Sequence, residues 1–212
     1  MKENGEKVAW EGEILAVQPR IRMTRCFDQR HHGYSGYVLR VRGRRDGEDG
    51  EFVVAIGKAA QAKHAFRVGD VVKGKGHPVV DARLETADLY KVSGLKRLAW
   101  GPESFEDAPP FLGVPPILEV YRERGHRRLA SRTYQIHCKS CLWGCAMVVE
   151  IIVDQRNPSR KEYRRESFCY GPKSCPLYEA GATRHVPGRN GMSWEEEDWV
   201  DEDATAHRGP DD

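Results

Sequence analysis

Five of the six cysteines fall into two short clusters near the C-terminal end of the chain. The segments "HCKSCLWGC" (137–145) and "FCYGPKSCPLY" (168–178) contain them. In a reducing compartment, clustered cysteines serve more often as metal ligands or redox groups than as structural disulfides. We therefore expect a metal centre built from this set of thiols: Cys138, Cys141, Cys145, Cys169 and Cys175.

The segment between the two clusters has the pattern of a β-hairpin. A β-branched apolar run (146–154) and an alternating run (162–168) flank a polar turn (155–161) that contains Asn-Pro. Two antiparallel strands would bring both clusters to the open end of the hairpin. This arrangement resembles a zinc ribbon, in which two pairs of thiolates close a tetrahedron around one Zn²⁺. A lone hairpin is marginally stable in water, so the metal would supply the missing stability.

The spacing of the thiols leaves the type of metal centre open. Cys138 and Cys141 form the expected C-x2-C pair, whereas Cys169 and Cys175 are separated by five residues and Cys145 is an extra thiol. A C-x2-C-x3-C run followed by a distant cysteine also resembles a [4Fe–4S] site, with Cys175 or Cys169 as the fourth ligand. Zinc, an iron–sulfur cluster and thiol redox chemistry without a metal all remain alternatives.

The first hundred residues have the patterns of strands, with one short helix among them. Alternating apolar residues and turn signals predict three strands, a helix rich in helix-forming residues, and two further strands. The expected strands cover 10–23, 35–44, 51–57, 67–80 and 87–98, and the helix covers 58–66. The fold class is therefore mainly β.

This order of elements resembles the OB-fold, a five-stranded barrel with a helix between its third and fourth strands. The run "FRVGDVVKGKG" is similar to the F-x-x-G-D-x-V-x-x-x-G segment of many single-strand-binding OB domains, and "YKVSGLKRL" is similar to their last strand. The resemblance covers about residues 8–98. It implies a barrel that binds single-stranded DNA or RNA across its second and third strands, with the loops as clamps.

Basic and aromatic residues in this region fit such an interface, because single strands are held by cations that follow the backbone and by rings that stack on bases. Most of them lie in what we expect to be a long loop, residues 20–37, between the first two strands. The others alternate on the second and fourth strands. The candidate nucleic-acid-binding residues are Arg20, Arg22, Arg25, Phe27, Arg30, Tyr34, Tyr37, Arg40, Arg42, Lys73 and Lys75.

Charge and proline content divide the chain into four segments. Residues 1–99 form the expected OB-fold domain, 100–119 a proline-rich acidic connector, and 120–190 the cysteine-rich metal-binding module. The last segment, 191–212, contains nine acidic residues and one basic residue. We expect it to be either a disordered solubilising tail or an acidic mimic lying in the basic groove of the protein. Residues 193–200 have the pattern of a short helix with Ser193 as its N-cap. Ile117, Val120 and Tyr121 also have helical spacing, and Gly125 would stop that helix.

Several functional classes find no support in the sequence. The chain has no apolar run long enough to span a bilayer and no secretory signal, so we expect a cytoplasmic protein without a membrane partner. No P-loop, G-x-S-x-G or H-E-x-x-H motif is present, and catalysis is not expected. The expected function is single-stranded nucleic-acid binding with a metal-containing module. An iron–sulfur redox protein or enzyme subunit and a protein–protein adaptor are the alternatives.

Overall fold

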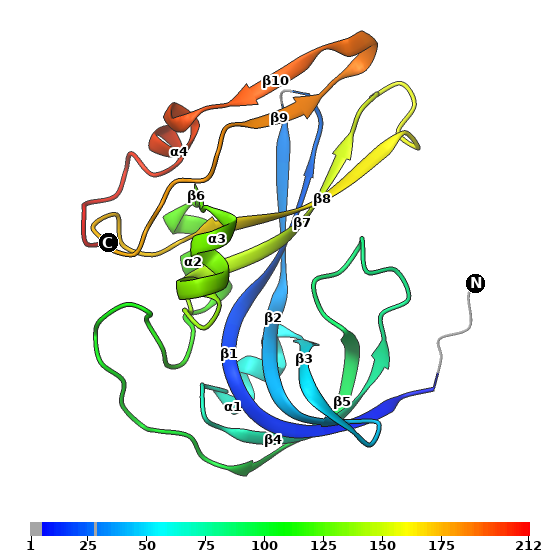
Figure 1. Cartoon of the computed structure of the whole chain (residues 1–212), viewed down its shortest axis with the longest axis vertical. Coiled ribbons are helices and arrows are strands. Elements are labelled where there is room, and N and C mark those ends of the chain that lie inside the picture. Colours follow the sequence, from blue (N-terminus) through cyan, green and yellow to red (C-terminus); the bar gives the residue numbers. More distant parts are fainter. Residues whose placement is uncertain (1–5, 28) are drawn as a thin grey trace.

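The computed structural model describes residues 6–27 and 29–212 and is mainly β. Its long first strand passes through both halves of the molecule (Figure 1). The strands are β1 (Val8–Arg25), β2 (Arg30–Arg45), β3 (Glu48–Ile56), β4 (Val71–Pro78), β5 (Leu89–Ala99), β6 (Arg127–Arg128), β7 (Gly144–Ile152), β8 (Lys161–Cys169), β9 (Arg184–Pro187) and β10 (Ser193–Glu196). The helices are α1 (Lys58–His64), α2 (Leu118–Arg124), α3 (Ser131–Thr133) and α4 (Asp198–Ala204), with a π-helical turn at Tyr134–Cys138 and a 3-10 turn at Arg189–Gly191.

Five strands close into a ring in the lower half of Figure 1. The hydrogen-bonded order is β1-β2-β3-β5-β4, and β4 returns to β1 through antiparallel pairing. The contact between β3 and β5 is a single parallel pair, Val54 with Leu89, so the ring is weakest there. Helix α1 lies between β3 and β4 in the chain. The predicted order of three strands, a helix and two strands is confirmed.

The expected long loop between the first two strands is wrong. β1 continues to Arg25 and β2 begins at Arg30, so residues 20–25 and 30–36 form a two-stranded ribbon that extends beyond the ring. Ile21 and Met23 point into the core while Arg20 and Arg22 are more exposed. This is the alternation of a half-buried strand. The many arginines in this stretch gave it the polar character of a loop in the sequence.

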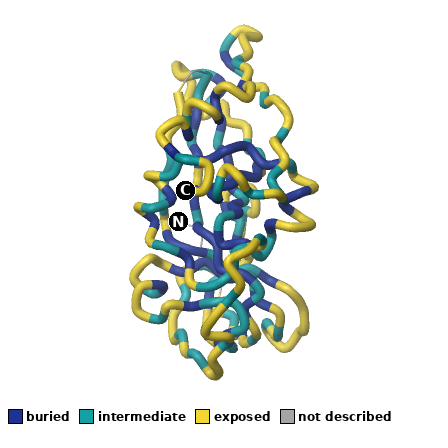
Figure 2. Tube along the Cα trace, turned by 90° about the vertical axis from the view of Figure 1, so that its left-hand side faces the viewer, coloured by how far each residue is buried: buried dark blue, intermediate teal, exposed yellow. Residues whose placement is uncertain are grey.

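The far end of β1 joins the ring to the second half of the chain. Residues Arg22–Arg25 pair in parallel with Val148–Ile151 of β7, and β7 pairs with β8 as the expected hairpin. One hydrophobic core runs from Trp10 in the ring to Met147 and Phe168 in the hairpin. Figure 2 shows buried chain in dark blue in both halves. The hairpin is therefore packed on the ribbon and does not stand alone.

Two elements outside the sheet bear on earlier expectations. Helix α2 ends at Arg124 and is followed by Gly125, whose φ of 67° suits glycine, so the predicted stop of this helix is confirmed. The predicted helix with Ser193 as N-cap is wrong, because Ser193–Glu196 pairs with β9 and α4 begins only at Asp198. Tertiary pairing has overridden local preference there. Among the described residues, no helix is long and apolar enough to cross a membrane.

Candidate nucleic-acid interface and cysteine cluster

The arginines at the base of the ribbon are bound to one buried carboxylate. The Nε of Arg20 donates to both oxygens of Glu85 at 3.1 Å, and Arg22 lies 2.8 Å from the Oε2 of Glu85. Burial raises the pKa of Glu85, but hydrogen bonds and charge from both arginines outweigh burial and leave the pKa below its usual value. Glu85 is therefore held as a carboxylate, and much of the charge of this arginine pair is neutralised within the protein.

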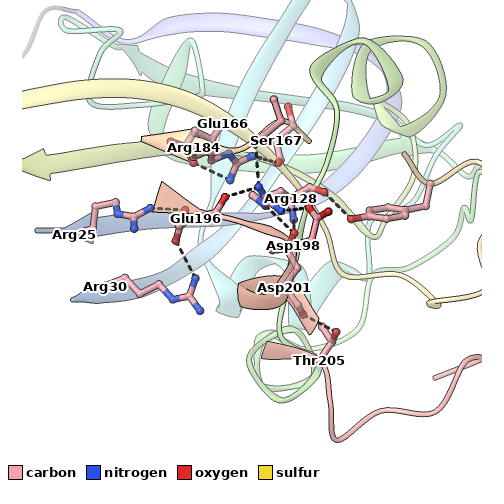
Figure 3. A network of polar contacts seen from close by, with 12 residues as sticks. Arg25, Arg30, Arg128, Glu166, Ser167, Arg184, Glu196, Asp198, Asp201 and Thr205 are labelled. Carbon is pink, nitrogen blue, oxygen red and sulfur yellow. Dashed lines mark hydrogen bonds and ion pairs between the residues drawn. The ribbon is translucent and has the colours of Figure 1, made fainter. Parts of the chain in front are cut away.

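The arginines at the tip of the ribbon meet the C-terminal acidic segment (Figure 3). Arg25 lies 2.6 Å and Arg30 3.2 Å from the carboxylate of Glu196 on β10. The side chains of Arg25 and Glu196 are only 3% and 5% exposed, so this pair has been removed from water. Burial raises the pKa of Glu196, but the two arginines outweigh it and the net shift is downward. One carboxylate of the acidic segment thus lies among basic residues of the ribbon.

A second buried arginine fixes the same segment to the hairpin (Figure 3). The Nε of Arg128 donates to Asp201 at 2.9 Å, and a further nitrogen donates to the backbone oxygen of Glu196 at 2.5 Å. Residues 193–204 therefore form a strand and a helix that are tied to the rest of the protein. A disordered tail, one of the two alternatives for this segment, is not what the structure shows.

The aromatic candidates do not form an open stacking platform. Tyr37 lies in the core and its hydroxyl donates to the carbonyl of Pro116 at 2.8 Å, so it cannot stack on a base and its assignment to the interface is corrected. Phe27 packs edge-on against Trp194, with ring centroids 6.4 Å apart. The guanidinium of Arg122 covers the ring of Tyr34.

The remaining basic candidates lie on β2 and β4; Arg42, Lys73 and Lys75 are exposed, whereas Arg40 is half-buried. Leu39 and Val41 are fully buried, and Arg40 and Arg42 alternate with them on β2, as the pattern predicts. Arg42 forms an exposed ion pair with Glu51 at 3.0 Å, and such pairs are weak in water.

Lys73 and Lys75 are exposed on β4 and line an open groove of about 870 Å³ across β1, β2, β4 and β5. We call it the ring groove. Sequence reasoning missed Lys96, which faces Lys73 across the β4–β5 pairing and also lines the groove. Within residues 6–27 and 29–212, none of these three lysines forms an ion pair. The groove also contains Arg44, Glu11, Asp46 and Asp49, so its charge is mixed with a small basic excess.

Four of the five clustered cysteines surround one small cavity. Cys138 and Cys141 come from the turn before β7, Cys169 ends β8, and Cys175 lies in the loop that follows. We call these four residues the cysteine cluster. Burial and the neighbouring thiols raise the pKa of Cys138 to about 12. Cys145 lies apart: it is completely buried in the main core, and its Sγ donates to the carbonyl of Pro19 at 3.4 Å.

Gln18 of β1 fastens the first cysteine pair to the ring. Its Nε2 donates to the carbonyl oxygens of Cys138 at 2.9 Å and Cys141 at 2.8 Å, while its Oε1 accepts from the hydroxyl of Tyr134. Nothing in the sequence marks Gln18, because its partners lie more than a hundred residues away. All three of these hydrogen bonds hold the turn that carries the first pair of thiols.

The cysteine cluster is not arranged as a finished metal site. Among residues 6–27 and 29–212, no group of three or more His, Cys, Asp or Glu side chains is placed so that it could hold a metal ion. All six cysteines are free thiols. The choice between zinc and iron–sulfur thus remains a prediction.

Comparisons with known proteins do not assign the chain to a family. No family model matches the chain, and neither the curated proteins nor the solved structures contain a significant match.

Proposed function

We propose that this protein binds single-stranded nucleic acid, DNA or RNA, and that the ring of five strands is an OB-type barrel. The order of strands in the ring and the position of α1 between β3 and β4 support the barrel. A fold of this type hosts many functions, so the proposal rests on the chemistry of the ring groove.

The observation that carries the proposal is the state of the lysines in the ring groove. Lys73, Lys75 and Lys96 are exposed, lie on two paired strands, and have no ion-pair partner among the described residues. A polyanion in the groove would gain these contacts without breaking internal ones. Phosphate groups are suitable partners, because their neutralisation releases counterions.

The ribbon arginines are unsuitable as the main contacts. Binding of phosphate to Arg25 would have to replace a buried carboxylate at 2.6 Å, at the cost of leaving Glu196 without its partner. We therefore place the interface on the ring groove and the adjacent Arg42, away from Arg20, Arg22, Arg25 and Arg30.

The groove also predicts the character of the binding. Among the described residues that line the groove, Trp10 is the only aromatic one, and it is buried. Without an open ring to stack on bases, affinity comes mainly from backbone phosphates. We expect binding that tolerates different sequences and falls steeply as salt increases.

The test is fluorescence anisotropy with labelled single-stranded oligonucleotides over a series of salt concentrations. We expect Lys73→Ala/Lys75→Ala to weaken binding by about tenfold at low salt and to reduce the salt slope by about one to two. The matched control is Lys58→Ala/Lys63→Ala, which removes two exposed lysines from α1 and should leave binding nearly unchanged.

Two outcomes would contradict the proposal. Equal losses in both double variants would show nonspecific attraction to total charge. Failure of the unmodified protein to bind any single strand at low salt would refute the proposed function itself. Binding of a protein partner with little dependence on salt would favour the adaptor alternative.

A further inference from the structure

The cysteine cluster combines residues from two segments of the chain that are separated by the β7–β8 hairpin. The turn after Tyr134–Cys138, the end of β8 and the loop beyond it meet at a cavity of about 10 Å³. Cys138, Cys141 and Cys169 pack together in a small cluster of their own, separate from the main core. Free thiols gathered in this way are the ligands that zinc selects.

Backbone N–H groups surround the sulfur atoms. The N–H of Gly171 donates to the Sγ of Cys169 at 3.3 Å. The backbone N–H groups of Trp143, Phe111 and Gly144 likewise lie within hydrogen-bonding reach of the Cys141 sulfur. Donors of this kind stabilise a thiolate and orient it, as outer groups do around metal ligands.

Three arginines hold the loop that carries the second pair of thiols. Arg124 donates to the carbonyl of Tyr170 at 2.7 Å, Arg208 to that of Gly171 at 2.6 Å, and Arg127 to that of Pro172 at 2.9 Å. Zn²⁺ bound by four thiolates carries a net charge of −2. Arginines that fix the loop would also offset this charge.

We propose that Cys138, Cys141, Cys169 and Cys175 are the ligands of a single structural Zn²⁺ and that Cys145 is not a ligand. This inference does not depend on nucleic-acid binding. Because the described side chains do not yet form a group that could hold a metal ion, binding of Zn²⁺ must bring the four sulfur atoms closer together. Cys175 is only partly buried and lies in a turn, so it has the most freedom to move.

The position of Cys145 separates this site from the iron–sulfur alternative. Successive residues of a strand point to opposite faces. Cys145 joins the main core with Met147, whereas its neighbour Ala146 packs against the cysteine cluster. The C-x2-C-x3-C arrangement of a [4Fe–4S] site therefore cannot form without turning β7 over. The cavity is also about the size of one water molecule, which favours one ion over an eight-atom cluster.

The first test uses the unmodified full chain. We expect elemental analysis to find one zinc per chain and no stoichiometric iron or sulfide. Mass-spectrometric mapping after alkylation should show Cys138, Cys141, Cys169 and Cys175 protected with zinc and modified after chelation. Cys26, which lies outside the cluster, should react in both states, and Cys145 should be unreactive in both.

The second test compares variants. Cys175→Ser should weaken zinc affinity by at least tenfold in competition with a chromogenic chelator, whereas Cys145→Ala should change it less than threefold. Cys175 is the partly buried ligand, so its replacement is the least damaging to the fold. Co²⁺ titration of the apo chain gives an independent readout, because four thiolates produce a characteristic tetrahedral visible spectrum.

Three results would overturn the proposal. They are the absence of zinc and of a Co²⁺ spectrum in folded protein, stoichiometric iron with sulfide, or an equal loss of zinc affinity in Cys145→Ala and Cys175→Ser.

Discussion

The ribbon and the ring groove carry basic residues in similar strand patterns, but only one of them presents its charge to solvent. Arg20, Arg22, Arg25 and Arg30 share two carboxylates, Glu85 and Glu196. Lys73, Lys75 and Lys96 have no ion-pair partner within the described residues. A basic stretch can therefore either stabilise the fold or bind a ligand, and the positions of acidic residues distant in the sequence decide which.

If the ribbon arginines serve the fold, removal of their buried partner should give the largest effect. We expect Glu196→Gln to lower the free energy of unfolding by about 3 kcal/mol, because Arg25 is left buried without a counter-charge. Urea denaturation measures this. Glu197→Gln, one residue away and exposed, is the control and should change stability by less than about 0.5 kcal/mol. Equal effects of the two variants would contradict a structural role for the ribbon charges.

Acid should weaken the ribbon region through the half-buried His32 and the buried His126, whose ring centroids lie 4.8 Å apart. Burial, with Arg30 and His31, lowers the pKa of His32 to about 4, and burial, with His32 and Arg30, lowers that of His126. Since both folded-state values lie below the unfolded value, the unfolded chain binds protons first as pH falls. The free energy of unfolding should therefore decrease from about pH 6.5 downward, by up to about 1.4 kcal/mol per pH unit for each histidine.

Variants of His32 and of its exposed neighbour His31 test this effect. Urea midpoints measured between pH 7 and 5 should depend less on pH in His32→Gln than in the unmodified chain. His31→Gln, at an exposed position, should change the profile much less, because burial and not His31 is the main cause of the lowered pKa of His32. The Glu85 and Glu196 pairs add a further loss below about pH 4.5, because their lowered pKa values stabilise the fold only while they are ionised. A flat profile between pH 7 and 5 would show that the histidines are not buried as described.

The smallest effect is expected where the ribbon is most exposed. Arg22 is 44% exposed but paired with Glu85, so Arg22→Ala should change affinity for single strands less than twofold. Lys96→Ala, the matched change in the ring groove, should weaken binding by about two- to fivefold and reduce the salt slope by about one. Anisotropy titrations at low salt compare them. A larger loss of affinity in Arg22→Ala than in Lys96→Ala would indicate that the ribbon, and not the ring groove, is the interface.

The sequence was sufficient for the parts of the fold that depend on local pattern. Alternation in 35–44 identified the buried face of β2, and the apolar run 146–154 identified β7. Gly125 marked the end of α2. Prediction from the sequence failed for the ribbon and for residues 193–196. Partner strands impose extended structure there, although the local pattern is polar or helix-like.

The amino-acid sequence supplies the chemical groups: clustered thiols, basic strands and an acidic C-terminal segment. How these groups are used depends on which of them the fold brings together. Glu85 and Glu196 reach the ribbon from segments 63 and 171 residues away, and Gln18 reaches Cys138 across 120 residues. The tertiary structure also places Cys145 in the main core and the other four clustered cysteines around one cavity. The physical reason is that charge neutralisation and thiol proximity depend on distances in space, which spacing along the chain does not encode.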